Sequence, residues 1–346
     1  MAEPHAEPHA PPRTHTAPDP GAAPDAGATP DAGARPGGRV SSPPAHEAAP
    51  RHQRARGRVR VAFARRLPAG HDAPDPDHAP GAPTRLTDLH QSGCLKLRVP
   101  RVHGPVPEAV LINTAGGLTG GDALEVGIEL GAGAALMVAT QTAERLYRSA
   151  GGEAAARVSL TVGAGARLAW LPQETIAFEG AALRRSLEVD LAPGARLVTV
   201  EPLVLGREAM GETLRRAWVA DDRRVRVGGT LLHAESPRFD AAGGWGERLA
   251  GWDGRRAAAS LLMVGPEAPA LVERVRSMAG EDGAADAFDP PPGGGPPRLV
   301  ARLLCTDGLA LRRRLVPMLA LVNAAAMGQT CPTEGHGASL PRVWTL

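Results

Sequence analysis

A glycine-rich stretch, LINTAGGLTGGDALEVGIEL at residues 111–130, has the composition of a phosphate-binding loop. Walker-type loops place a lysine and a hydroxyl residue after the last glycine, whereas Asp122 stands there in this chain and would repel phosphate. Dinucleotide-binding loops run into a helix, but residues 124–130 alternate apolar and polar side chains, which is typical of a strand. The stretch therefore predicts tight backbone turns with positive φ, supplied by Gly116, Gly117, Gly120 and Gly121.

Paired carboxylates offer a second chemistry, general acid and base catalysis. Asp122 and Glu174 are the pair that a β-rich hydrolase or isomerase could use. The chain contains no nucleophile elbow, no HExxH sequence and no convincing catalytic triad. Its cysteines form no Cys-x-x-Cys pair, which excludes an ordinary zinc ribbon. An acid/base enzyme therefore remains the alternative interpretation.

An internal repeat predicts the elements that position these residues. Turns rich in glycine and alanine recur at residues 131–136, 163–168 and 192–197, with spacings of 32 and 29 residues, and each follows an alternating strand. A unit of about thirty residues cannot bury its apolar face alone, so such units stack on one another. We expect a mainly β fold, either an irregular β-superhelix or layered β-sheets, with an ordinary β-sandwich as the alternative.

The last third of the chain changes character. Residues 268–280 and 309–328 carry apolar side chains at helical spacing, and Pro317 strains the second of these segments. Between them, the proline and glycine content of residues 280–297 predicts a flexible surface loop, followed by a strand at 298–305. We therefore expect a β body with two α-helices near its C-terminus.

Composition limits the classes of function. Residues 1–55 are rich in proline, alanine and glycine and have almost no large apolar side chains, so we expect a disordered extension before a domain at 56–346. The net charge of +2 and the aromatic content of 3% do not favour nucleic-acid binding. No secretory signal and no stretch of about eighteen apolar residues occurs, so we expect a cytoplasmic protein without a membrane span.

Two sets of residues are minor candidates for metal capture. The extension contains His5, His9 and His15, and Cys331 lies near His336 later in the chain. Neither set lies on an element that would bring its ligands together on one ion. Both remain weak alternatives to a site inside the domain.

Five strings occur in a consistent order along most of the chain: AGGLTGGD, QTAERLYRS, WLPQETIAFEGA, GREAMGE and the terminal LPRVWTL. Together they resemble the urease accessory proteins of the UreD family, also called UreH, over about residues 56–346. Many members of that family carry His-Pro-Pro before the first glycine pair, whereas this chain has Asn113, Thr114 and Ala115. The resemblance therefore implies no imidazole ligand at that loop.

This resemblance implies a right-handed β-superhelix with two helices, and a non-enzymatic scaffold that delivers nickel in the cytoplasm. Members of the family bind apo-urease and the accessory protein UreF, and recruit the GTPase UreG through UreF. Nickel is then passed toward the bis-nickel active site of urease, and a passage through the UreD body has been proposed for the ion. The implied cofactor state is a transient nickel ion, with no cofactor tightly bound.

Nickel in transit needs exchangeable oxygen or nitrogen ligands, because a closed set of thiolates would retain the ion. The carboxylates inside the matched strings are the candidates for a nickel path: Asp122, Glu174, Glu201 and Glu212. Each could instead hold a corner of the fold by a hydrogen bond or an ion pair, for instance to Arg148 or Arg207. The candidates for a partner interface or a structural clasp are Tyr147, Arg148, Arg207, Arg342 and Trp344.

Overall fold

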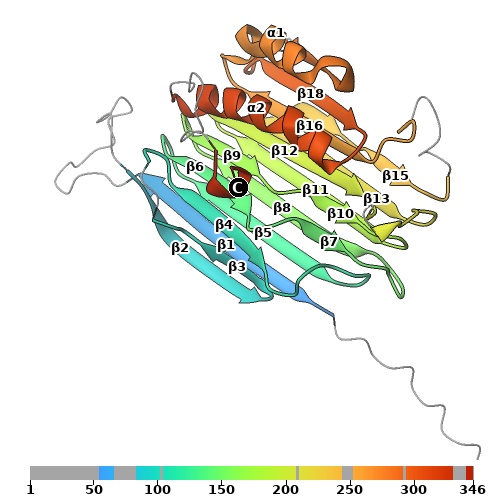
Figure 1. Cartoon of the computed structure of the whole chain (residues 1–346). Coiled ribbons are helices and arrows are strands. Elements are labelled where there is room, and N and C mark those ends of the chain that lie inside the picture. The colour runs from blue at the N-terminus through green and yellow to red at the C-terminus, as the bar shows by residue number, and fades with distance from the viewer. Residues whose placement is uncertain are drawn as a thin grey trace, which may run out of the picture. The chain divides into compact units, whose positions relative to one another are not determined.

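Two layered β-sheets form the body of the protein, and two helices cover one of them (Figure 1). The structure is a computed structural model that describes residues 54–65, 83–101, 104–207, 210–243, 252–290, 294–329 and 340–345. The histidines of the N-terminal extension and the Cys331–His336 pair lie outside these residues. The disorder expected before residue 56 therefore stays a prediction.

The first sheet has eight strands in the described ranges, in the order β14-β13-β11-β8-β5-β1-β2, with β15 beside β13. These strands are β1 (Arg56–Arg65), β2 (Thr84–Gly93), β5 (Ala123–Leu130), β8 (Ala154–Val162), β11 (Ala182–Leu191), β13 (Trp218–Val227), β14 (Thr230–Glu235) and β15 (Arg238–Asp240). The central strands run parallel, with Leu130 paired to Val162 and Val162 paired to Leu191. Buried residues alternate with more exposed ones along β5, so one face of this sheet packs inward and the other meets water.

The second sheet has ten strands over the same ranges, and β17-β18-β16-β12-β9-β6-β4-β3 is its main order. Its strands are β3 (Leu95–Arg98), β4 (Glu108–Asn113), β6 (Ala135–Thr140), β7 (Glu144–Leu146), β9 (Arg167–Leu171), β10 (Thr175–Ala177), β12 (Arg196–Leu205), β16 (Ala257–Val264), β17 (Gly283–Phe288) and β18 (Arg298–Cys305). The strand β6 is buried along almost its whole length, because this sheet packs on both faces. Its sequence, ALMVAT, is accordingly a continuous apolar run and does not alternate.

The glycine- and alanine-rich turns of the repeat lie on top of one another. Each turn carries the chain from the first sheet to the second, and Gly133 N donates to Ala164 O at 2.8 Å while Gly165 N donates to Pro193 O at 3.3 Å. Successive repeats pair in parallel, unlike the antiparallel strands of an ordinary sandwich. The expected mainly β fold is confirmed, with repeats stacked as in a β-solenoid.

The two expected C-terminal helices are confirmed as α1 (Ala268–Ala279) and α2 (Gly308–Met327), with Pro317 inside the second. They lie on the face of the second sheet that points away from the first sheet (Figure 1). The side chain of Asp307 caps the start of α2 by accepting a hydrogen bond from Ala310 N at 2.8 Å. None of the helices in the described ranges combines the length and the apolar composition that a membrane span requires.

The expected flexible loop at 280–297 is wrong over its first half. Residues Gly280–Asp282 form a short 3-10 helix, and β17 (Gly283–Phe288) follows it as an antiparallel partner of β18. The sequence of β17, GAADAF, has few of the β-branched and aromatic residues that mark a strand, so pairing with β18 decides its structure.

Candidate functional site

A narrow third face joins the second sheet back to the first at one edge of the stack. The short strands β7 and β10 pair in parallel, and β10 also pairs with the end of β12. Their inward side chains form a buried aliphatic ladder in register along the stack: Leu118, Leu146, Ala177 and Leu205. Segments about thirty residues apart in sequence therefore meet at this edge.

The glycine-rich loop lies at the start of this edge. Gly116, Gly117 and Gly121 have φ values of 76°, 150° and 87°, in the region that side chains rarely adopt. Gly120 lies outside that region, but a Cβ there would be 2.6 Å from the carbonyl oxygen of Gly151. The loop leads directly into β5 at Ala123, so no helix N-terminus is present to bind a phosphate.

Asp122 fastens this loop to the start of the first sheet. Its side chain is buried, and its Oδ1 accepts a hydrogen bond from Ala55 N at 2.7 Å. Its Oδ2 accepts a second bond from Thr119 N at 2.8 Å, three residues earlier in the loop. Both carboxylate oxygens therefore have backbone donors, which is the geometry of a structural clasp.

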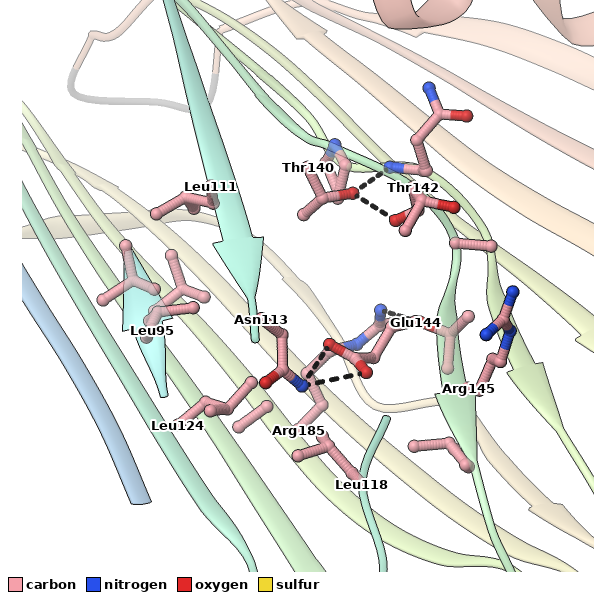
Figure 2. Close-up of a pocket in the computed structure, with 18 of the residues that line it drawn as sticks. Leu95, Leu111, Asn113, Leu118, Leu124, Thr140, Thr142, Glu144, Arg145 and Arg185 are labelled. Atoms are coloured by element: carbon pink, nitrogen blue, oxygen red, sulfur yellow. Dashed lines mark hydrogen bonds between the residues drawn. The ribbon is translucent and has the colours of Figure 1, made fainter. Parts of the chain in front are cut away.

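A cavity of about 150 Å³ lies between the two sheets beside the third face (Figure 2). Leucine and valine side chains from both sheets form most of its wall, for example Leu95, Leu111 and Val126. Polar and charged residues complete the wall, among them Asn113, Glu144, Arg145, Arg185 and Glu201. The cavity thus combines apolar walls with polar groups, as is typical of binding sites.

Glu144 is the acidic group nearest the loop side of this cavity, and Asn113 faces it (Figure 2). Burial raises the pKa of Glu144 to about 7, although Asn113 Nδ2 donates to both carboxylate oxygens at 3.1 Å. The two residues come from the end of β4 and the start of β7, which the repeat places side by side. Near neutral pH this carboxyl group can therefore exchange its proton for a cation.

A chain of alternating charges begins at Arg185, another residue of the cavity wall. Arg185 Nη1 lies 2.6 Å from Glu201 Oε2, and Arg185 Nη2 lies 2.5 Å from Asp221 Oδ2. Arg223 continues the chain, 2.5 Å from Asp221 and 2.9 Å from Glu235. Burial opposes ionisation of Asp221, but the guanidinium groups of Arg185 and Arg223 outweigh it and lower the pKa of Asp221. Guanidinium groups thus already pair with Glu201, Asp221 and Glu235 between the sheets.

The carboxylates predicted for a nickel path do not converge. Glu201 projects between the sheets and accepts a hydrogen bond from Trp170 Nε1 at 2.9 Å. Glu174 faces the opposite side of the same sheet, where Arg312 of α2 donates to it at 2.7 Å. Asp122 belongs to the loop clasp and lines no part of the cavity, and neither does Glu174.

Glu212 belongs to a further corner, where Arg207 Nη2 donates to it at 2.9 Å and the Arg207 and Glu179 backbone amides also donate. The alternative of an ion pair with Arg207 is therefore present for this carboxylate. Across the described ranges, no three His, Cys, Asp or Glu side chains are grouped closely enough to hold a metal ion. A nickel path through these four carboxylates stays a prediction, and the acid/base pair gains no support from the geometry.

The aromatic and arginine candidates separate into two groups. Tyr147 and Arg148 are exposed on the outer side of the third face, next to Arg207. Trp344 instead docks into the body, where it is 1% exposed and its Nε1 donates to Leu171 O at 2.9 Å. Arg342 remains exposed, and its backbone N–H donates to Glu108 at 3.3 Å. Trp344 therefore packs into the body, the arrangement that its near-terminal position favoured, whereas Arg342 stays at the surface.

Sequence reasoning missed the polar residues of the cavity, above all Asn113, Glu144 and Arg185. Glu144 lies inside QTAERLYRS, one of the strings that carry the resemblance. Its position in that string is the signal that could have identified it. Arg223 lies in a strand of the sequence WVADDRRVRV, where charged residues occupy inward positions that normally hold apolar ones. Its partner Glu235 lies twelve residues later, on the other strand of a β-hairpin. The pairing depends on the register of that hairpin, which no local sequence pattern reveals.

Comparison with known proteins agrees with this architecture. Residues 55–345 match the family model described as UreD urease accessory protein. A protein of Dinoroseobacter shibae named urease accessory protein UreD is 44% identical over 300 residues, which are 86% of this chain and 95% of the relative. Proteins of the same name from a Chelativorans species and from Agrobacterium fabrum are 43% and 37% identical, over 76% and 86% of this chain and 89% and 93% of the relatives. The chain belongs to the UreD family of urease accessory proteins.

Proposed function

We propose that the protein is a non-enzymatic scaffold for urease maturation, which acts in the cytoplasm and helps to bring nickel to apo-urease. In this proposal it binds apo-urease and UreF, and contacts UreG through UreF. Family membership over nearly the whole domain is the observation that carries the proposal. The word accessory in the names of the relatives fits a role in making urease and not in hydrolysing urea.

The geometry of the carboxylates supports a scaffold over the acid/base alternative. A general base needs a free oxygen within hydrogen-bond reach of a substrate. Both oxygens of Asp122 accept backbone hydrogen bonds, and Glu174 is held by Arg312 under α2. The pair therefore offers no shared surface on which a substrate could react.

Nickel enters this proposal as cargo. Glu144 would offer it a carboxylate, which is a weak and exchangeable ligand, and the Nδ2 group of Asn113 would hold that carboxylate in place. A carboxyl group with a pKa of about 7 binds a cation only after it loses its proton, so its hold on the ion would be loose. Loose ligation suits an ion that must leave the scaffold for urease.

Deletion of the gene tests the proposed function. We expect urease polypeptide at its usual level but with little nickel, because the scaffold acts after synthesis of the enzyme. Nickel per urease, measured by atomic absorption on purified enzyme from cells grown with limiting metal, checks this. Return of the full chain on a plasmid should restore the nickel content, and a deletion strain with fully loaded urease would rule the proposal out.

A further inference from the structure

The outer side of the third face, which we call the corner face, consists of Arg145, Tyr147, Arg148, Ile176 and Phe178. Leu146 and Ala177 point inward in the aliphatic ladder, so Arg145 of β7 and Ile176 of β10 point outward, and Tyr147 and Phe178 follow directly after these strands. Arg145, Tyr147 and Arg148 are exposed, and Ile176 is half-buried beside them. Tyr147, Arg148 and Ile176 line no part of the cavity, whereas Arg145 also borders it and Phe178 is buried beneath the others.

An aromatic pair gives the corner face a rigid centre. The ring of Tyr147 meets the ring of Phe178 edge-on, with centroids 5.4 Å apart and an interplanar angle of 78°. The guanidinium group of Arg207 covers Phe178 at 4.4 Å from the ring centroid. Tyr147 is nevertheless 42% exposed, and its hydroxyl makes only a long hydrogen bond of 3.4 Å to Gly116 O. A large, fixed and incompletely satisfied side chain thus faces solvent.

The charges on this surface are unbalanced. Neither Arg145 nor Arg148 forms an ion pair with any carboxylate of the described residues, although both are exposed. Two carboxylates of this corner are already paired, since Glu179 accepts bonds from Arg216 and Glu212 accepts bonds from Arg207. Glu144, next to Arg145 in sequence, lines the cavity, where burial raises its pKa against the effect of the Arg145 charge. Because Glu179 and Glu212 are already paired, the guanidinium groups of Arg145 and Arg148 have no ion-pair partner among the described residues. Both groups lie beside the aromatic pair.

We propose that the corner face docks an acidic segment of a protein partner, with an apolar side chain of that segment covering Tyr147. Tyrosine and arginine are the residue types that most often dominate binding energy at interfaces. Free guanidinium groups provide bidentate donors for carboxylates and steer an acidic partner toward the surface. This inference rests on the proposed function, under which the partner is UreF or apo-urease.

A protein partner fits this surface better than a nucleic acid does. A polyphosphate chain needs a continuous run of free cations, whereas Glu179 and Glu212 interrupt the arginines of the corner. The edge-on packing of Tyr147 against Phe178 also leaves no stacked platform for successive bases. The same packing suits a single aliphatic or aromatic anchor from a protein.

Charge reversal tests the corner face in the full-length protein. The double variant Arg145→Glu/Arg148→Glu should weaken binding of purified UreF or of purified apo-urease by about tenfold to a hundredfold, measured by surface-immobilised binding. Tyr147→Ser should weaken binding of the same partner, and added salt should weaken the wild-type complex. The matched control is Arg274→Glu/Arg313→Glu, which reverses two exposed arginines on α1 and α2 that make no ion pair within the described residues and should leave binding unchanged.

The outcomes separate this inference from the proposed function. If the charge-reversed protein has an unchanged melting temperature and binds both UreF and apo-urease as tightly as the wild type, the corner face is overturned and the scaffold role remains intact. Capture that disappears after nuclease treatment would show a nucleic-acid bridge and would also overturn it. If the unmodified protein binds neither partner, the proposed function fails and the inference fails with it. Loss of binding in the corner variants alone would establish the docking surface.

Discussion

At the scale of single residues, Asp122 joins two parts of the chain that are far apart in sequence. Its two oxygens accept from Ala55 N and Thr119 N, so an amide in its place can satisfy only one of the two donors. We expect Asp122→Asn to lower the free energy of unfolding by about 1–3 kcal/mol, and Asp122→Ala to lower it further. Urea unfolding of the purified variants measures the effect.

The control for Asp122 is Asp190→Asn, which makes the same chemical change at an exposed aspartate of β11. It should leave the unfolding free energy unchanged. A stable Asp122→Asn protein that binds its partners but leaves urease short of nickel would contradict the clasp and restore Asp122 to the nickel path.

Glu144 makes stability depend on pH in a defined direction. Its pKa is about 7 in the folded protein, against about 4.3 in an unfolded chain, so the folded state keeps a proton that the unfolded state releases. The unfolding free energy should therefore fall as pH rises from about 4.5 to 7 and then level off, by on the order of 1–3 kcal/mol. Glu144→Gln keeps a hydrogen-bonding group without the charge and should remove this decline.

Chemical unfolding at a series of pH values compares the two proteins. Glu129→Gln on β5 is the matched control, because its carboxylate is exposed and its removal should leave the slope unchanged. An identical pH profile for Glu144→Gln and the wild type would show that the carboxyl group ionises freely in the cavity.

Sequence alone could identify which carboxylates were unusual but not what each one contacts. Glu201 and Glu174 lie at similar places in successive repeats, which suggested a common edge. They face opposite sides of one sheet, because Glu201 lies on β12 whereas Glu174 lies in the link between β9 and β10, where strand alternation does not set the direction of a side chain. The partner of Glu174 is Arg312, 138 residues away, and no local pattern encodes a contact of that range.

At the scale of elements, the repeat was the most informative feature of the sequence. The stacking was predicted from the recurring turns at 131–136, 163–168 and 192–197 and from the strands before them. Both a period of two and a recurring turn can be recognised in the local sequence. The strand β17 shows no such pattern, since its small residues are held by pairing with β18. Proline and glycine content predicts an irregular loop well only where the segment cannot pair with the edge of a neighbouring strand.

The sequence also did not predict the third face, although the strings QTAERLYRS and WLPQETIAFEGA contain its two short strands. Strands β7 and β10 are three residues each, too short for a periodic pattern. They form because the longer strands on either side place them in register, and the ladder of Leu146 and Ala177 then buries their inward side. A surface built from such short elements can only be recognised once the stack exists.

At the scale of the whole molecule, the second sheet separates two apolar cores. One core fills the space between the sheets, and the other lies under α1, α2 and the terminal segment that contains Trp344. A chain of charged residues enters the first core from Arg185 and Glu201 toward β13 and β14. There Arg223 and Glu235 pair across the hairpin, and Arg302 of β18 reaches Glu235 at 2.8 Å. Because the ion pairs link both sheets, this end of the body is held by charge as well as by apolar packing.

The boundary of the functional domain yields the last prediction. The family match begins at residue 55, and Ala55 N–H is a donor to Asp122. Deletion of residues 1–53, with the initiating methionine directly before Arg54, should leave melting temperature, partner binding and nickel in urease unchanged, because the removed composition cannot build a core. Deletion of residues 1–55, with methionine in place of Arg56, should lower the unfolding free energy by about 1–3 kcal/mol, because Asp122 loses the donor Ala55 N and Ala123 N loses the acceptor Ala55 O.

The pair of truncations locates the edge of the required chain to within three residues, Arg54 to Arg56. Normal stability of the first protein with poor urease activation would assign a function to the extension that its composition does not reveal. Equal stability of both proteins would show that the bond from Ala55 contributes nothing, and the clasp would then rest on Thr119 alone. The expected difference between the two arises because a backbone donor, and not a side chain, completes the loop at Asp122.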